Sequence, residues 1–94
     1  MTMIAQYKPV GRLDGVTAAA HEAELKALLT GDVHSITIDM SALDYVSSAG
    51  LRILLVIAKA AKAKGGAVVI ASPTPSILEV LRISGLDTIL DVRS

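Results

Sequence analysis

Apolar side chains follow two spacings along the chain, one typical of buried strands and one typical of helices. Residues 33–40 and 67–71 are short runs rich in β-branched side chains, which favours strands. Residues 48–64 are apolar around most of a helical circumference. The pattern predicts strands over residues 3–13, 33–40, 67–71 and 86–92. It predicts helices over residues 16–29, 48–64 and 76–84.

Local features refine these elements. Pro9 and Gly11 interrupt the first strand, which is typical of an edge strand or a bulge. Asp14 stands where its carboxylate could accept hydrogen bonds from the free N–H groups of the first helix, so it is the predicted N-cap. The continuous apolar run at 67–71 predicts a strand buried on both faces.

The alternation of these elements predicts the fold class. The order β-α-β-α-β-α-β implies parallel crossovers and an α/β layer fold. A chain of 94 residues is enough for one domain with one core, so we expect a single domain over residues 1–94. Only about 13 residues precede Asp14, which leaves room for one strand before the first helix. We expect about four strands in a mixed, largely parallel sheet, with about three helices.

Composition and charge narrow the class of function. The chain has 9 Lys and Arg and 9 Asp and Glu, so its net charge of zero lacks the electrostatic footprint of a nucleic-acid binder. It has no cysteine, which excludes thiol chemistry and fits a reducing compartment. No apolar run approaches the roughly 18 residues of a membrane span, and no signal peptide is visible. We expect a cytoplasmic protein with no nucleic-acid or membrane partner.

Enzyme chemistry finds little support. A nucleophilic serine needs a base within hydrogen-bond reach, and the two histidines, His21 and His34, are placed as surface residues away from the candidate serines. The chain has no glycine-rich phosphate loop and no convergent metal ligands, so we expect no cofactor and no catalysis. The lysines that end the second helix, Lys59, Lys62 and Lys64, are interpreted as a solvated helix end.

The strand-to-helix joint at Ser47 and Ser48 is the strongest candidate site. In an open α/β sheet, sites gather at the carboxyl ends of the strands, where Asp14, Asp39 and Asp44 are also expected. The free N–H groups and the positive dipole end of a helix meet there. The local pattern favours simple capping by a serine. The alternative is phosphorylation of one serine while the other caps the helix.

Several short motifs give the chain a resemblance to a known family. These are Gly11-Arg-Leu-Asp14 with Thr17, Asp39-Met-Ser41, Tyr45-Val-Ser-Ser-Ala-Gly-Leu51 and Arg82-Ile-Ser-Gly-Leu86. In this order and spacing they resemble a STAS domain, specifically a bacterial anti-sigma factor antagonist, over almost the whole chain. The resemblance implies a single-domain STAS-like fold.

The resemblance also implies a switch. The family's phosphoacceptor lies two residues before the signature glycine, which is Ser48 here. The unphosphorylated form would bind an anti-sigma factor that is also a serine kinase, and this would free a sigma factor. Phosphorylation of Ser48 would end the complex, and a serine phosphatase would reset it. The residues implied near the phosphosite or the partner are Asp14, Asp39, Ser47, Ala49, Gly50, Leu51 and Arg52.

Two features depart from the family pattern. The family often has Asp where this chain has Ser47, which could move the cap or offer a second acceptor. The family usually begins with two strands, whereas one is expected here, and its edge could be exposed or paired with a second copy in a weak homodimer. Two other functions stay open: a STAS subunit of a transporter or sensory complex that is never phosphorylated, and a small enzyme or ligand carrier.

Overall fold

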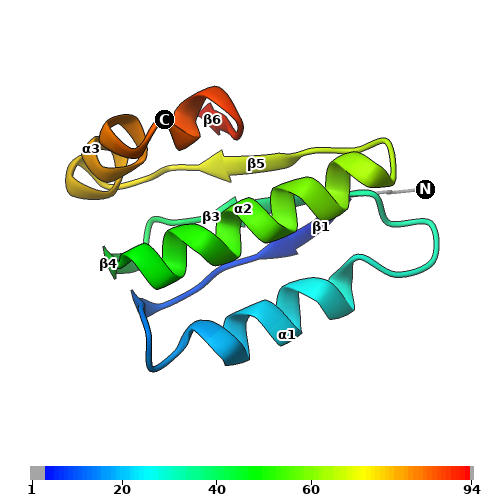
Figure 1. The fold of residues 1–94 in the computed structure, drawn as a ribbon, viewed down its shortest axis with the longest axis horizontal. Helices are drawn as coiled ribbons and strands as arrows, with labels where there is room; N and C mark the ends of the chain where they lie inside the picture. Colours follow the sequence, from blue (N-terminus) through cyan, green and yellow to red (C-terminus); the bar gives the residue numbers. More distant parts are fainter. Residues whose placement is uncertain (1–3, 94) are drawn as a thin grey trace.

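A four-stranded parallel sheet forms the centre of the protein, and its helices pack on one side of it (Figure 1). The computed structural model describes residues 4–93. The strands of the main sheet, in spatial order, are β1 (Ile4–Tyr7), β3 (Ser35–Asp39), β5 (Val68–Ala71) and β6 (Asp91–Arg93). A separate pair of short strands is formed by β2 (Gly11–Leu13) and β4 (Leu43–Val46). The helices are α1 (Ala18–Leu28), α2 (Ser48–Ala63), α3 (Pro75–Ser84) and the 3₁₀ turn η1 (Leu86–Thr88).

The predicted α/β class, four-stranded sheet and three α-helices are confirmed. The sheet is wholly parallel in its described ladders, where a mixed, largely parallel sheet was expected. The predicted single strand over residues 3–13 is wrong, because residues 8–10 separate two strands that belong to different sheets. Met3, its predicted first residue, lies outside the described residues. Two strands fit before the first helix because β2 needs only three residues.

The chain between β3 and α2 also departs from expectation, because it contains the additional strand β4. Leu43 and Val46 at its two ends are buried, and the two residues between them are exposed. The predicted last strand, 86–92, begins instead as the turn η1, and only Asp91–Arg93 pair with β5. Both corrected segments are very short. Their secondary structure therefore depends on the segments with which they pair in the fold, and not on their own hydrophobic periodicity.

Each face of the main sheet has its own character. Ile36, Ile38 and Ile70 point into the core, where they meet Leu25 of α1 and Ile57 of α2. The alternate positions point to the other face, where Gln6 and Asp91 are exposed and Thr37, Val69 and Ala71 are half-buried. The prediction that the strand at 67–71 is buried on both faces is therefore wrong. No helix covers the second face within residues 4–93, so its polar side chains meet water (Figure 1).

The histidines are less exposed than expected, since both are half-buried and hydrogen bonded. His21 lies on α1, with its Nδ1 2.6 Å from the hydroxyl of Tyr7 on edge strand β1. His34 precedes β3, and its ring contacts the Ser35 hydroxyl at 3.0 Å. Its backbone lies beside Gly66, past the C-terminal end of α2 and far along the helix from Ser48. Neither histidine is placed to act on the candidate serines.

Candidate functional site

The N-terminus of α2 is held against strand β2 by backbone contacts. The Ser47 N–H donates to the Leu13 carbonyl at 3.0 Å. Gly50 in the first turn is buried, and a Cβ built on it would lie 2.4 Å from the same carbonyl and 2.8 Å from Cγ2 of Val46. Only glycine permits this approach without movement of the backbone. The glycine of the sequence motif therefore sets the position of the whole first turn.

Ser47 and Ser48 have different environments. The Ser47 side chain accepts a hydrogen bond from the Gly50 N–H at 3.3 Å, and its carbonyl accepts from the Leu51 N–H at 2.9 Å. Ser47 is thus the N-cap of α2, which agrees with the predicted capping by a serine at this joint. Ser48 is the first helical residue and is exposed. Its hydroxyl takes no part in capping.

The start of α2 carries unsatisfied positive potential. Its first turn contains no acidic side chain. Within residues 4–93, the N–H groups of Ser48 and Ala49 donate to no other protein group. Free N–H groups and the positive end of the helix dipole stabilise an anion at this position. A phosphate carried on Ser48 would stand beside both.

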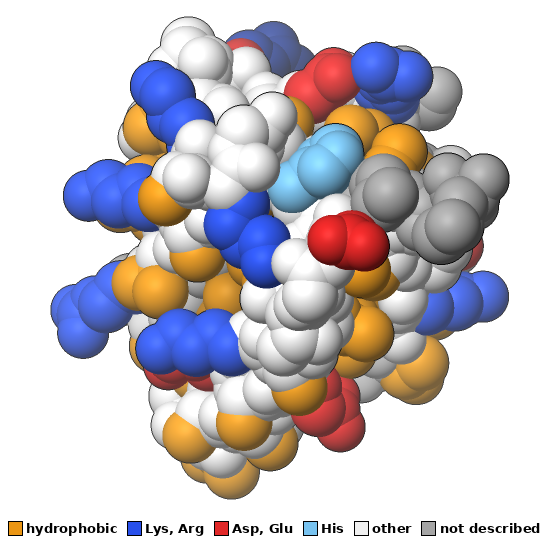
Figure 2. Space-filling view, turned by 90° about the vertical axis from the view of Figure 1, so that its right-hand side faces the viewer, with side chains coloured by type: hydrophobic (Ala, Val, Ile, Leu, Met, Phe, Trp, Pro, Cys, Tyr) orange, Lys and Arg blue, Asp and Glu red, His pale blue; other side chains and the backbone are white. Residues whose placement is uncertain are grey.

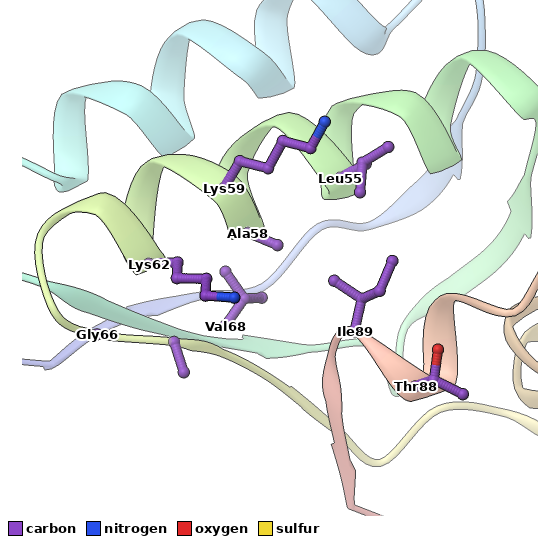
Figure 3. Close-up of a pocket in the computed structure, with 9 residues that line it drawn as sticks. Leu55, Ala58, Lys59, Lys62, Gly66, Val68, Thr88 and Ile89 are labelled. Carbon is purple, nitrogen blue, oxygen red and sulfur yellow. The ribbon is translucent and has the colours of Figure 1, made fainter.

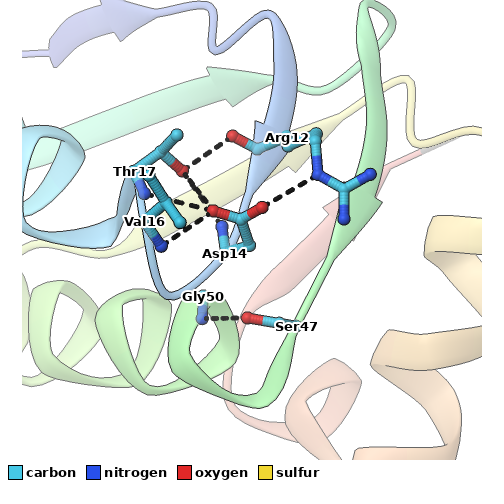
Figure 4. A network of polar contacts seen from close by, with 6 residues as sticks. All are labelled: Arg12, Asp14, Val16, Thr17, Ser47 and Gly50. Atoms are coloured by element: carbon cyan, nitrogen blue, oxygen red, sulfur yellow. Dashed lines mark hydrogen bonds and ion pairs between the residues drawn. The ribbon is translucent and has the colours of Figure 1, made fainter.

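Asp14 lies in the loop between β2 and α1, next to this turn, and its carboxylate is fixed from several sides (Figure 4). Its Oδ1 accepts from the N–H groups of Val16 and Thr17 at 3.0 and 3.1 Å, and its Oδ2 accepts from Nε of Arg12 at 2.8 Å. The Thr17 hydroxyl closes the loop by donating to the Arg12 carbonyl at 2.9 Å. The Arg12 side chain, followed by these backbone donors, lowers the pKa of Asp14 to about 2. The carboxylate is therefore charged and preorganised.

Asp14 accepts hydrogen bonds from free backbone N–H groups, as predicted, but it is not the N-cap residue of α1. Its carboxylate binds free N–H groups, but these belong to the turn before α1, and the N-cap residue of that helix is Thr17. The shift arises because Gly15–Thr17 form a separate turn ahead of the helix. The Asp14 carboxylate is consequently held in the loop and not at the first helical residue.

Arg12 is a residue of the site that sequence reasoning missed. Its guanidinium lies 4.5 Å from the ring centroid of Tyr45 and also pairs with Asp14. Arg12 and Tyr45 are direct partners in the β2–β4 ladder. The spacing of Arg12 and Asp14, two apart on a strand, is consistent with one shared face. The contact with Tyr45 required knowledge of a pairing between distant segments.

A shallow groove of about 360 Å³ runs beside Ser48. Its lining combines apolar and polar side chains from α2, the end of α3 and η1: Ser48, Leu51, Arg52, Leu55, Ser84 and Leu86. Arg52 is exposed and follows Ser48 by one helical turn. The predicted residues Ser48, Leu51 and Arg52 therefore share one surface, whereas Ala49 is half-buried behind it.

Asp39 and Asp44 make no contact with the group formed by Asp14, Ser47 and Ser48 among the described hydrogen bonds. The Asp39 carboxylate accepts from the Ser41 N–H at 2.9 Å, and that bond is the main cause that lowers the pKa of Asp39. Asp44 is exposed on β4. Neither bonds to Asp14, Ser47 or Ser48 within the described residues. Of the three predicted carboxylates, only Asp14 follows a residue bonded to the start of α2, since Leu13 accepts from the Ser47 N–H. Its carboxylate bonds to Arg12, Val16 and Thr17 and not to either serine.

Two further kinds of feature matter in the part of the chain that the structure describes: clusters of metal ligands and helices able to span a membrane. Residues 4–93 contain no group of three or more His, Asp or Glu side chains arranged to hold a metal ion. None of the helices described there is both long and apolar enough to cross a bilayer.

Comparison with known proteins gives a consistent picture. A family model described as the STAS domain matches residues 2–94. A protein of Bordetella bronchiseptica, BtrV, is 37% identical over 82 residues, which cover 87% of this chain and 71% of that protein. Its name describes it as an anti-sigma factor antagonist.

Solved structures agree on the fold. TM1081 of Thermotoga maritima superposes with a TM-score of 0.91 at 20% identity, covering 100% of this chain and 81% of that one. The anti-sigma factor antagonist SpoIIAA in its unphosphorylated form gives 0.83 at 21% identity, covering 97% and 80%. The phosphorylated form of SpoIIAA from Bacillus gives 0.76 at 20% identity, covering 100% and 86%.

Proposed function

Because this chain belongs to the STAS domain family, we propose that it is a cytoplasmic anti-sigma factor antagonist switched by phosphorylation of Ser48. In this role it is a regulatory binding protein and not an enzyme, as STAS antagonists are. The unphosphorylated form binds an anti-sigma factor that is also a serine kinase. Phosphate transfer from Mg-ATP to Ser48 releases the complex, and a serine phosphatase restores the binding form.

The proposal rests on one observation: the hydroxyls of the adjacent Ser47 and Ser48 have different environments. Ser47 caps α2, so its hydroxyl is engaged in structure. Ser48 presents its hydroxyl to solvent beside two free N–H groups. A phosphate there adds about −1.5 to −2 charges that the helix end tolerates, so the fold survives modification. A partner packed against a neutral serine would meet that charge and separate.

Exposed apolar residues that flank β2 and Asp14, together with the groove beside Ser48, support a docking surface for a protein partner. Val16 is 92% exposed in the turn bonded to Asp14, and Val10 is 70% exposed just before β2. The groove beside Ser48 adds the half-buried Leu51 and, as part of its wall, the buried Leu86. Apolar side chains gathered around a charged, preorganised loop are typical of protein interfaces.

The test is site-resolved phosphorylation with matched serine variants. The chain, Ser48→Ala and Ser47→Ala would each be incubated with Mg-ATP and an extract of the native cell, and phosphate would be located by mass spectrometry. We expect one phosphate on the unmodified chain and on Ser47→Ala, and none on Ser48→Ala. A phosphate on Ser47, or an unmodified Ser48 in an extract with active serine kinases, would contradict the mechanism.

A binding experiment tests the consequence of the phosphate. Ser48→Ala should retain its kinase partner in the presence of Mg-ATP, whereas Ser48→Asp should retain little of it. Circular dichroism should show the same fold for both variants. Unchanged partner binding and unchanged behaviour in cells for both variants would favour a constitutive STAS subunit instead.

A further inference from the structure

A second hollow lies at the opposite end of α2 from Ser48 (Figure 3). It has a volume of about 460 Å³, within the range of small-molecule sites. The C-terminal half of α2 forms one wall, η1 and the residue after it form the other, and the start of β5 forms the floor. Figure 3 shows Lys59 and Lys62 leaving α2, with Thr88 and Ile89 on the other side.

The cavity exists because no long helix closes the sheet beyond α2. The connection from β5 to β6 contains α3 and then the three-residue turn η1, and only the end of η1 and the residue after it line this cavity. Small side chains on the opposing surfaces, Ala58 and Ala67, leave further room. The floor is apolar, with Val68 2% exposed, while Ile89 at the rim is 57% exposed. An apolar body could therefore be removed from water here.

Positive charge gathers at this cavity without a counter-charge. Lys59 and Lys62 line it, and its lining contains no Asp or Glu. Neither lysine forms an ion pair with another residue of the described 4–93. Figure 2 shows Lys and Arg side chains interleaved with hydrophobic ones over this end of the molecule. The whole chain has zero net charge, so an attraction for anions here is local.

The remaining polar groups of the wall are already engaged. The Gly66 N–H donates to the Ala61 carbonyl at 2.9 Å, and the Ala67 N–H donates to the Ser35 hydroxyl at 3.0 Å. The Thr88 hydroxyl donates to the Gly85 carbonyl at 2.7 Å. Phosphate sites usually converge several free backbone N–H groups on one anion. This wall offers two ammonium groups and little else.

From this combination we infer that the cavity binds a small amphipathic carboxylate. The apolar body lies on Val68, Ala58 and Leu55, and the carboxylate lies at the rim, where Lys59 and Lys62 supply the positive charge. Leu55 also lines the groove beside Ser48, so an occupied cavity borders the surface proposed for partner docking. The inference does not depend on Ser48 being a phosphoacceptor.

Binding of octanoate to the full chain tests the inference, with octanol and octylammonium as ligands of the same chain length. Dissociation constants would come from NMR titration, with the amide signals of Gly66, Val68 and Ile89 as reporters. We expect octanoate to bind about tenfold more tightly than octanol, and octylammonium to bind more weakly than either. The signals of these three residues should shift, while those around Asp14 stay in place.

Lysine variants distinguish binding of octanoate in this cavity from general electrostatic attraction to the protein surface. The double variant Lys59→Gln/Lys62→Gln should lose the tenfold preference for octanoate over octanol, whereas Lys8→Gln/Lys26→Gln, with the same charge change, should keep it. Ala58→Leu should fill the cavity and weaken both ligands, with its fold checked by thermal unfolding.

Three results would overturn the inference. Octanoate and octanol could bind equally, or the preference could survive loss of both lysines. Alternatively, the free chain could self-associate in a way that Lys59→Gln/Lys62→Gln abolishes, and a second copy would then be the occupant. Each result leaves the phosphorylation of Ser48 untouched, so failure here and failure of the proposed switch are distinguishable.

Discussion

At the scale of single residues, Gly50 determines how closely α2 approaches β2. Gly50→Ala places a methyl group 2.4 Å from the Leu13 carbonyl, so the helix must shift. We expect a loss of about 2 kcal/mol in the free energy of unfolding, measured by urea denaturation. Gly15→Ala is the matched control, because a Cβ there meets nothing within 4 Å. An equal effect of both substitutions would contradict the close approach.

Asp14 gives a second prediction at this scale. Its pKa is lowered from 3.8 to about 2, chiefly by Arg12, so the folded state favours the charged carboxylate. The resulting stability is fully present above the unfolded pKa and is lost as pH falls through the folded pKa. The stability difference between the chain and Asp14→Asn should therefore shrink between about pH 4 and pH 2. A difference that persists below pH 2 would contradict this assignment.

Arg12→Gln tests the cause of the lowered pKa. Loss of the guanidinium should move the Asp14 titration, followed by NMR of its carboxyl carbon, upward toward the ordinary value. The backbone donors from Val16 and Thr17 remain, so part of the lowering should persist. Arg93→Gln is the control, because Arg93 pairs with Asp91 on β6. Movement of the Asp14 titration in the control would show that general charge, and not the direct contact, sets the pKa.

At the scale of elements, the start of α2 carries two serine hydroxyls, one that caps the helix and one that we propose to be the phosphoacceptor. Ser47→Ala removes the cap of a 16-residue helix and should lower the free energy of unfolding by about 1 kcal/mol. Ser48→Ala removes an exposed hydroxyl and should change it by less than about 0.5 kcal/mol. Chemical denaturation of both variants measures the contrast. Equal losses would mean that Ser48 also stabilises the helix end.

The elements also show what could be predicted from the sequence. The three helices and the two central strands were predictable because each carries its own periodic apolar pattern. Strands β2 and β4 were missed because three or four residues carry too little pattern, and because they pair only with each other. The motif distinguished Ser47 from Ser48; Ser47 is the N-cap of α2, and the role of Ser48 as phosphoacceptor stays a prediction. The contact between Arg12 and Tyr45 depends on the missed pairing, so it could not be predicted.

At the scale of the whole molecule, the helices described within residues 4–93 cover one face of the sheet and leave the other open. Parallel sheets are usually covered on both faces. Here the ladders align Gln6, Thr37, Val69 and Asp91 in one row across the uncovered face. Three of these four side chains are polar, which makes solvation of that face tolerable. The apolar run at 67–71 concealed this asymmetry, because Val69 is apolar although it points to the wet face.

Adjacent valines on β5 test the asymmetry with one and the same substitution. Val68 is 2% exposed on the helix side, whereas Val69 is half-buried on the uncovered side. Threonine has nearly the shape of valine, so each change mainly adds a hydroxyl. Val68→Thr buries that hydroxyl and should cost about 1–3 kcal/mol in the free energy of unfolding. Val69→Thr should cost less than about 0.5 kcal/mol, because water can reach the new group. Urea denaturation of both variants gives the comparison, and a large loss for Val69→Thr would mean that the second face is covered in solution.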